Sequence, residues 1–403
     1  MSKIESIRCI LLSAPYGDAN HPEILECFPN GPKRTIGLVE VLLENGVKGY
    51  GEGYLAVFAP KVFKSITDLC KPYLIGKDCF DIHRRVADLC SVCDYWSLQG
   101  AARHVTSAIE IALVDAKSKS LKCPAYDLFG GSKTDEIEAY GSGGICDTKD
   151  HFREELDLLN SLGIKKYKIR AVKEDILRTA WILEEAAKHG IEVGIDMCQN
   201  LADPPQKVED VTRYVDEIKK ISDKKILFLE EAIGPANPEG FKELRKSIGI
   251  QICGGEVITT PLEMIERIKN NIYDFVQPDA SVIGGMTAVM EIFSETKKND
   301  IDTVVHAWGG PVAIMANYQC AFACHGKLVE YPMIPFKLEE EMFSDQRRIQ
   351  NGKVLKPTAD GIGIYFSDDI EHRYEFDDEA VYSCFLAERG QPPDEYWKDS
   401  NLK

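Results

Sequence analysis

The feature that most constrains the fold is a regular alternation of short β-branched segments with amphipathic helical segments between residues 131 and 335. Such alternation predicts parallel strands joined by crossover helices. The predicted strands cover residues 136–143, 165–170, 191–197, 226–231, 250–256, 273–279, 302–308 and 328–332. Eight strands in about 200 residues favour a closed barrel of parallel strands. A doubly wound open sheet is the alternative.

The first 130 residues follow a different pattern, with strands first and helices afterwards. Residues 4–14 and 36–43 have strand character, and Glu44-Asn45-Gly46 predicts a tight turn into a further strand at residues 47–50. Helical periodicity takes over in residues 62–128. Strands followed by helices indicate an α+β domain rather than a part of the barrel.

The domain organisation follows from these two patterns. The expected fold class is α/β, a barrel preceded by an α+β domain. After residue 335 the chain is acidic and loop-rich, and residues 352–357 and 361–366 predict two short strands. We therefore predict an N-terminal domain over residues 1–130, a barrel over 131–335, and a C-terminal segment over 336–403 that packs back on the N-terminal domain.

Charged residues end the predicted barrel strands, although strands covered on both faces should be apolar. Their spacing corresponds to one strand–helix unit each time. In a barrel all the carboxyl ends of the strands open on one face, which is where the active sites of barrel enzymes lie. The residues expected around this opening are Lys168, Arg170, Asp196, Glu230, Glu256, Asp279, His306 and Glu330.

Three of these residues predict a metal site. Asp196, Glu230 and Glu256 end three successive strands, and three converging carboxylates without a counter-ion would repel one another. A divalent cation relieves that repulsion, and ligation by oxygen alone selects a hard ion such as Mg²⁺. Glu230 and Glu231 are neighbours, so only one of them is expected to face the barrel interior.

The remaining strand-end residues predict acid–base chemistry. Asp279 precedes His306 by one strand and is placed to accept from the imidazole, which would set its tautomer and raise its basicity. Lys168 and Arg170 are two residues apart, so both face the same side of their strand. Two inward cations could neutralise a substrate carboxylate or transfer a proton.

The composition of the chain limits the classes of binding partner that we expect. The chain carries 48 basic and 65 acidic residues, a net charge of −17, which disfavours nucleic acid and anionic membrane surfaces. No apolar run approaches the roughly 20 residues of a membrane-spanning helix. Thirteen scattered cysteines and an amino terminus without signal-peptide character fit thiols in a cytoplasmic protein. Cys90 and Cys93 form the only CxxC pair, too few ligands for a zinc site.

Taken together, these residues resemble the enolase superfamily and, within it, the mandelate racemase-like group. The resemblance covers nearly the whole chain. Residues 107–131 are similar to the linker helix of the family and its Gly-Gly end. The other segments that carry the resemblance are YKIR (167–170), GIDMCQN (194–200), FLEEAIGP (228–235), CGGEVIT (253–259), QPDASVIGGMT (277–287), VVHAWGG (304–310) and LVEY (328–331).

The resemblance implies an N-terminal capping domain over a modified (β/α)7β barrel. It implies one Mg²⁺ per subunit on the three acids named above, and abstraction by His306 of the proton α to a carboxylate. Lys168 would stabilise the developing oxyanion charge. Glu330 would hydrogen-bond the second carboxylate oxygen, carrying or sharing a proton. The resemblance also implies a homo-oligomer.

The departures from the family pattern concern the reaction. Arg170 stands where the racemases carry a lysine base, and arginine is not readily deprotonated, so a single principal base is expected. Cys198 stands where they have asparagine. The HAWGG segment looks more like members that act on sugar acids or their lactones, with Trp308 forming an apolar surface at the substrate. Residues 16–33 and 54–60 are expected to cover the substrate.

The function that we predict is that of an acid-sugar dehydratase. The alternatives are, in order, a cycloisomerase of a sugar-acid lactone or anhydro sugar acid, an epimerase, and a catalytically silent regulatory homologue. A phosphate site at Gly141–Gly144 is a weaker hypothesis, because that loop follows the first barrel strand instead of a late one.

Overall fold

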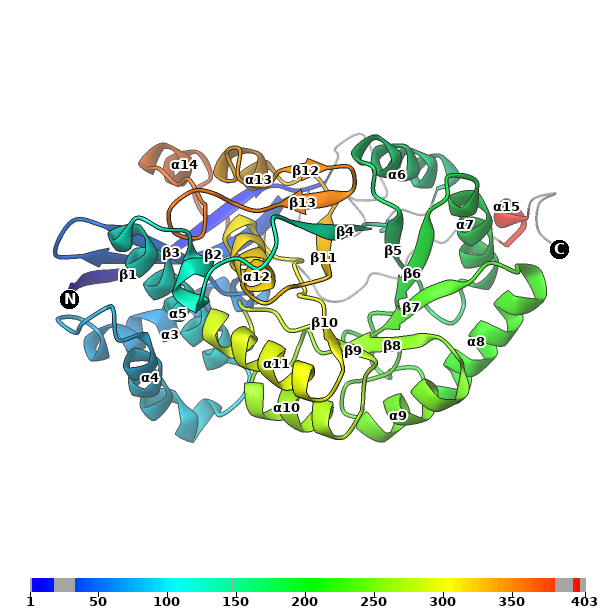
Figure 1. Cartoon of the computed structure of the whole chain (residues 1–403), viewed down its shortest axis with the longest axis horizontal. Helices are drawn as coiled ribbons and strands as arrows, with labels where there is room; N and C mark the ends of the chain where they lie inside the picture. Colours follow the sequence, from blue (N-terminus) through cyan, green and yellow to red (C-terminus); the bar gives the residue numbers. More distant parts are fainter. Residues whose placement is uncertain (1, 18–32, 146–147, 381–393, 399–403) are drawn as a thin grey trace.

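The structure of the protein is a computed structural model that describes residues 2–17, 33–145, 148–380 and 394–398. A small sheet with its helices lies at one end of the molecule, in blue and cyan in Figure 1, and a ring of strands surrounded by helices lies at the other. We refer to residues 1–130 as the N-terminal domain and to residues 131–335 as the barrel.

The N-terminal domain begins with an antiparallel sheet in the order β1-β2-β3. Its strands are β1 (Ile4–Pro15), β2 (Lys33–Leu43) and β3 (Lys48–Glu52). Gly46 takes a left-handed φ of 82° between β2 and β3, the conformation for which the Asn-Gly turn selects glycine. The predicted hairpin is confirmed, with β2 longer than expected.

The helices that follow pack against this sheet or against one another. They are α2 (Leu55–Phe58), α3 (Pro60–Cys70), α4 (Ile82–Ser97) and α5 (Ala101–Leu121), with short 3-10 turns η1 (Lys71–Tyr73) and η2 (Ala125–Phe129). The long helix α5 approaches β3 so closely that a Cβ on Gly51 would lie 1.8 Å from the carbonyl oxygen of Ala108. The glycines of β3 therefore allow the sheet and α5 to pack backbone to backbone.

Among the described residues the barrel has eight strands: β4 to β10 pair in chain order, and β11 pairs in parallel with β4. This pairing brings the last strand beside the first, and the strands form the ring seen in Figure 1, so the predicted barrel is confirmed. The strands are β4 (Glu136–Ser142), β5 (Lys166–Arg170), β6 (Glu192–Asp196), β7 (Ile226–Glu230), β8 (Gln251–Gly254), β9 (Phe275–Val276), β10 (Asp302–Thr303) and β11 (Leu328–Pro332).

Helices follow the strands and surround them (Figure 1). Several begin with a side-chain cap, such as Thr148, Asn237 and Thr260, which accepts from an amide of the first turn. The helices are α6 (Lys149–Leu162), α7 (Ile176–Lys188), α8 (Val208–Ile221), α9 (Pro238–Ser247), α10 (Pro261–Lys269), α11 (Met286–Lys298) and α12 (Pro311–Ala323).

Strands β9 and β10 are much shorter than predicted. Regular strand pairing stops early in both strands. Beyond that point the two segments are joined by isolated backbone hydrogen bonds, such as that from His306 N to Pro278 O at 3.0 Å. The predicted strand residues 277–279 and 304–308 are therefore irregular loop. This loop structure is what carries Asp279 and His306 over the barrel opening.

The C-terminal segment contacts both parts of the molecule. Strand β13 (Lys353–Leu355) pairs with β4, while Glu371 of α14 (Asp368–Arg373) forms an ion pair with Arg8 on β1 at 2.7 Å. The predicted strand at residues 361–366 is wrong. Gly361 and Gly363 have left-handed φ values of 76° and 86°, and neighbouring backbone amides bond to the N-terminal domain. The other elements are β12 (Ile349–Gln350), α13 (Lys337–Met342) and α15 (Asp394–Trp397).

None of the helices in the described ranges is long and apolar enough to cross a bilayer. The cysteines placed in those same ranges are free thiols, Cys90 and Cys93 among them.

Candidate active site

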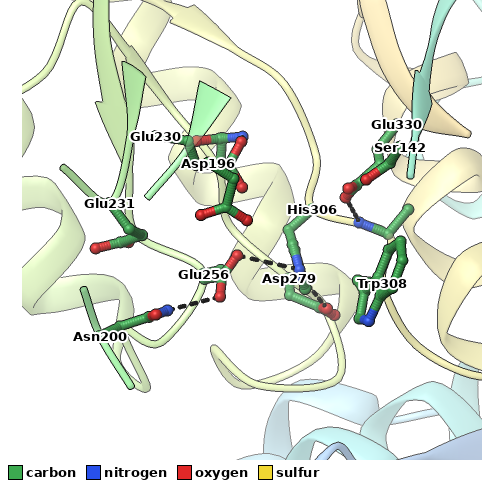
Figure 2. A network of polar contacts seen from close by, with 12 residues as sticks. Ser142, Asp196, Asn200, Glu230, Glu231, Glu256, Asp279, His306, Trp308 and Glu330 are labelled. Atoms are coloured by element: carbon green, nitrogen blue, oxygen red, sulfur yellow. Dashed lines mark hydrogen bonds and ion pairs between the residues drawn. The ribbon is translucent and has the colours of Figure 1, made fainter. Parts of the chain in front are cut away.

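Most of the strand-end residues singled out in the sequence lie close together in Figure 2, which labels Asp196, Glu230, Glu256, Asp279, His306 and Glu330. Strand β5 carries Lys168 and Arg170, β6 and β7 end in Asp196 and Glu230, and β11 carries Glu330. Glu256, Asp279, His306 and Trp308 lie in the loops that follow β8, β9 and β10. All the candidate residues predicted from the sequence are therefore brought together.

Asp196, Glu230 and Glu256 form a compact acidic triad. One carboxylate oxygen from each lies within 4.8 Å of the others, close enough for a single cation to contact all three. Burial raises the pKa of Glu230 to about 8, and the Asp196, Glu330 and Glu256 carboxylates add to the increase. The donors are all carboxylate oxygens, so the site suits a hard divalent cation such as Mg²⁺.

The side chains of the neighbours Glu230 and Glu231 point in different directions, as we predicted from the sequence, and have different partners. Glu230 Oε1 lies 2.5 Å from Lys168 Nζ, and its Oε2 accepts from Gln277 Nε2 at 2.6 Å. Glu231 has a left-handed φ of 42°, and its Oε1 accepts from the Gly255 amide at 2.6 Å. This backbone conformation, uncommon for a non-glycine residue, lets both side chains be buried. The triad contains Glu230 and not Glu231.

His306 lies between two carboxylates, as Figure 2 shows. Its Nδ1 is 2.8 Å from Asp279 Oδ2, and its Nε2 is 3.2 Å from Glu256 Oε2. Burial favours the neutral imidazole, but Glu256 and Asp279, helped by Glu330, raise the pKa of His306 to about 10. A cation on Glu256 would oppose that rise. Asp279 thus fixes the ring orientation and leaves Nε2 directed toward the acidic triad.

Lys168 and Glu330 form a fully buried ion pair. Lys168 Nζ lies 2.8 Å from Glu330 Oε1, and the Ala307 amide donates to Glu330 Oε2 at 2.7 Å. Burial alone would raise the pKa of Glu330, but Lys168, His306 and Arg170 hold it well below its usual range. The ammonium of Lys168 thus favours the carboxylate form of Glu330, and the expectation that Glu330 carries or shares a proton toward a substrate carboxylate stays a prediction.

Arg170 lies against the ring of Trp308, with its Cζ 4.0 Å from the ring centroid. Its Nη1 donates to Ser142 Oγ at 3.1 Å and to the Gly143 carbonyl at 2.8 Å. Stacking and hydrogen bonds hold the guanidinium in one orientation. Arg170 therefore supplies fixed positive charge, and Trp308 is a stacking partner as well as an apolar surface.

The N-terminal domain reaches the opening through two side chains, of which the sequence analysis missed Arg34. The ring of Tyr54 lies 6.1 Å from that of His306, and Arg34 Nη2 donates to the Trp308 carbonyl at 3.1 Å. Tyr54 belongs to the predicted covering segment 54–60. The other predicted covering segment, 16–33, falls mostly on residues 18–32, which lie outside the described residues.

Other site residues were also missed because they are not at strand ends or are uncharged. Gln277 donates to Glu230, and Asn200 Nδ2 donates to Glu256 Oε1 at 2.7 Å. Both follow a strand by a few residues, inside segments already noted for other residues. A search for amides beside the predicted acids would have found them. No such local signal marks Asn317, which bonds to Asp279 from α12.

The hypothesis of a phosphate site at Gly141–Gly144 is not supported by the backbone contacts. The Gly144 amide donates to Glu155 Oε2 at 2.8 Å, and the Gly143 amide donates to the Lys168 carbonyl at 3.0 Å. A buried carboxylate thus occupies an amide that an anion would need.

The buried acids predict how stability depends on pH and metal. Burial raises the pKa of Glu52 and Glu110 to about 7 and that of Glu230 and Glu231 to about 8, from a usual value of 4.5. Their contribution to stability is therefore present below about pH 4.5 and is lost as the pH rises through 7 to 8. With a chelator present, the melting temperature should fall between pH 5.5 and pH 8.

Added Mg²⁺ should reverse part of that loss, because ligation requires ionised carboxylates. The stabilisation is expected to reach about 2.7 kcal/mol when free Mg²⁺ is about 100 times Kd. Thermal denaturation at both pH values, with chelator and with Mg²⁺, checks this. A melting temperature that rises from pH 5.5 to 8 without metal, or a larger Mg²⁺ effect at the lower pH, would contradict the prediction.

Two family sequence profiles match the chain. Residues 151–370 match the profile described as "Enolase C-terminal domain-like". Residues 29–130 match the one described as "Mandelate racemase / muconate lactonizing enzyme, N-terminal domain". The two matches correspond to most of the barrel and to the N-terminal domain.

Known proteins similar to this chain include enzymes of sugar acids. An arabinonate dehydratase of Saccharolobus solfataricus is 25% identical over 343 residues, 83% of this chain and 89% of that protein. The 3,6-anhydro-D-galactonate cycloisomerase of Zobellia galactanivorans has a solved structure with a TM-score of 0.80 and 25% identity, covering 93% of this chain and 99% of that one. An L-talarate dehydratase of a Polaromonas species, solved with Mg and L-glucarate, shares the fold at a TM-score of 0.77 and 21% identity, over 93% and 98% of the two chains.

Proposed function

The chain belongs to the mandelate racemase and muconate lactonizing enzyme group of the enolase superfamily, and we propose that it removes the proton α to the carboxylate of an acid sugar and then eliminates water. The enzymes of this group to which it is similar are lyases and isomerases. The observation that carries the proposal is the pairing of His306 with Asp279, which leaves Nε2 directed at the acidic triad.

His306 acts as the base. With Nδ1 bonded to Asp279, its Nε2 is the atom that takes the α-proton. Asp196, Glu230 and Glu256 would hold a divalent cation, which would supply Lewis-acid stabilisation of the negative charge that develops on the substrate carboxylate. Lys168 adds a fixed positive charge on the same side of the site.

Elimination follows in our proposal. The electrons of the broken C–H bond form the Cα–Cβ double bond, the bond from Cβ to its hydroxyl oxygen breaks, and the proton on His306 leaves with that oxygen as water. Arg170 does not serve as a second base, because a guanidinium retains its proton. A single base supports elimination over racemisation, which needs proton transfer on both faces of the carbon.

The proposal of an acid-sugar substrate rests on the similarity to known enzymes. The similarity to the arabinonate dehydratase supports dehydration of a sugar acid. The similarity to the 3,6-anhydro-D-galactonate cycloisomerase supports cycloisomerisation as a second candidate. In that second reaction the ring oxygen of an anhydro sugar acid departs in place of hydroxide. We further propose Mg²⁺ as the cation, one per subunit, a homo-oligomeric assembly, and a cytoplasmic location, which the free thiols support.

A screen in D₂O tests the proposed function. Purified protein with Mg²⁺ is incubated with acid sugars and their lactones, and products are followed by proton NMR and mass spectrometry. Exchange of the α-proton with loss of water is the expected result for one or a few compounds. An isomer of otherwise unchanged mass would favour cycloisomerisation or epimerisation. Absence of exchange across the library, with Mg²⁺ shown to bind, would contradict the proposal.

A further inference from the structure

We propose that Glu52 and Asn317 are positioning residues for the base: Glu52 of the N-terminal domain holds the first turn of α12, and Asn317 of α12 orients Asp279 and through it His306. This inference rests on the proposed function, in which His306 takes the proton. It assigns to the contact between the two domains a role in setting the geometry of the base.

One carboxylate oxygen of Asp279 accepts three hydrogen bonds. Its Oδ1 accepts from the Ser281 amide at 2.7 Å, from Ser281 Oγ at 2.8 Å and from Asn317 Nδ2 at 2.9 Å. The other oxygen, Oδ2, faces His306 Nδ1 at 2.8 Å. Because three donors fix Oδ1, the plane of the carboxylate is fixed, and with it the direction from which Oδ2 receives the imidazole proton.

Asn317 is fully buried and uses both ends of its amide. Its Nδ2 also donates to the Ala313 carbonyl at 3.1 Å, one turn earlier in α12. Its Oδ1 accepts from the Ala280 amide at 2.9 Å, next to Asp279. A shift of α12 along its axis would therefore move the donor that Asp279 requires.

Glu52, at the end of β3, sets the position of α12. Its Oε1 accepts from the Gly310 amide at 2.6 Å and its Oε2 from the Ala313 amide at 3.1 Å, both at the start of the helix. A Cβ on Gly310 would lie 2.6 Å from Glu52 Oε1, so the approach depends on that glycine. A carboxylate at a helix N-terminus is also favoured by the helix dipole. Ala313 links the two halves, since it donates to Glu52 and accepts from Asn317.

The chain offers a matched control in Glu110 of α5. This residue is also fully buried, comes from the N-terminal domain, and accepts from the Met286 amide at 2.8 Å and the Thr287 amide at 3.0 Å in the first turn of α11. Within the described part of the chain, however, the side-chain donors to Asp279 come from Ser281, Asn317 and His306, and none comes from α11. Glu110 therefore shares the structural contact, but its connection to Asp279 runs through backbone hydrogen bonds, such as Gly285 N to Ala280 O at 3.1 Å, and not through a side-chain donor to the carboxylate.

The test compares Asn317→Ala and Glu52→Gln with Glu110→Gln. All three should lower the melting temperature. Only Asn317→Ala and Glu52→Gln should also lower kcat, by roughly 10- to 100-fold as for other residues that orient a functional side chain. KM should change little, because neither residue is placed to contact substrate. Ser281→Ala is a milder fourth variant that removes one donor to Asp279 and leaves α12 unchanged.

A spectroscopic measurement on the Mg²⁺-loaded protein does not require a substrate. With ¹⁵N-labelled histidine, the Nδ1 proton of His306 should give a downfield NMR signal that is absent from His306→Asn. The signal should shift or broaden in Asn317→Ala, Glu52→Gln and Ser281→Ala, and stay in place in Glu110→Gln.

An unchanged signal in folded Asn317→Ala and Ser281→Ala would overturn the inference, as would an equal loss of kcat in Glu110→Gln. The proposed function fails separately, if the unmodified protein exchanges no α-proton on any acid sugar. The position of the Nδ1 signal still decides the role of Asn317 in that case.

Discussion

His306→Asn is expected to abolish α-proton exchange while leaving Mg²⁺ binding in place. Asparagine keeps a polar group beside Asp279 but has no titratable nitrogen to accept the proton, so the contribution of general-base catalysis, roughly 100- to 10,000-fold, should be lost. The acidic triad keeps its three oxygens, because His306 is not one of its members. Exchange is measured by proton NMR in D₂O, and Mg²⁺ affinity by calorimetry.

His83→Asn provides the control for this experiment, since it makes the same chemical change on an exposed position of α4. That variant should retain full exchange. Exchange at the unmodified rate in His306→Asn would remove the base from our proposal. A loss of Mg²⁺ affinity in the same variant would instead assign His306 to the metal site.

Glu230→Gln is expected to have the second large effect, on metal binding. Glu230 is fully buried with both oxygens engaged, by Lys168 at 2.5 Å and by Gln277 at 2.6 Å. A glutamine amide would turn an NH₂ group toward one of these donors and remove the negative charge that a hard cation needs. Mg²⁺ affinity should fall by more than about 100-fold, above the roughly 10- to 100-fold typical of residues that only support a ligand.

Glu231→Gln is the control, because it changes the same side chain one residue further on. Glutamine there still offers an oxygen to the Gly255 amide, and Glu231 is not part of the triad. Its Mg²⁺ affinity should stay close to that of the unmodified protein. Calorimetric titration and the Mg²⁺-induced rise in melting temperature report both variants. If Glu231→Gln weakened binding more than Glu230→Gln, the assignment of the ligand would be reversed.

The barrel could be predicted from sequence because each strand–helix unit has its own periodicity. That local pattern sets strand order in a parallel sheet, and the geometry of a closed barrel then brings every strand end to one face. Asp196 and Glu230 were found in this way, although they lie 34 residues apart. Prediction of secondary structure was weaker where isolated hydrogen bonds take the place of regular strand pairing, as at the ends of β9 and β10 and around Gly361.

The sequence by itself determined the strand order, the acidic triad, and the pair of Asp279 with His306, because all of these depend on spacing along the chain. Only the tertiary structure decided which atoms meet. It places the ammonium of Lys168 against Glu330, which lowers the pKa of this carboxyl group, and it brings Glu52 and Asn317 to the two ends of one connection to the base. Such contacts join residues between 38 and 261 positions apart, and their energies depend on burial and distance, neither of which any local pattern of residues contains.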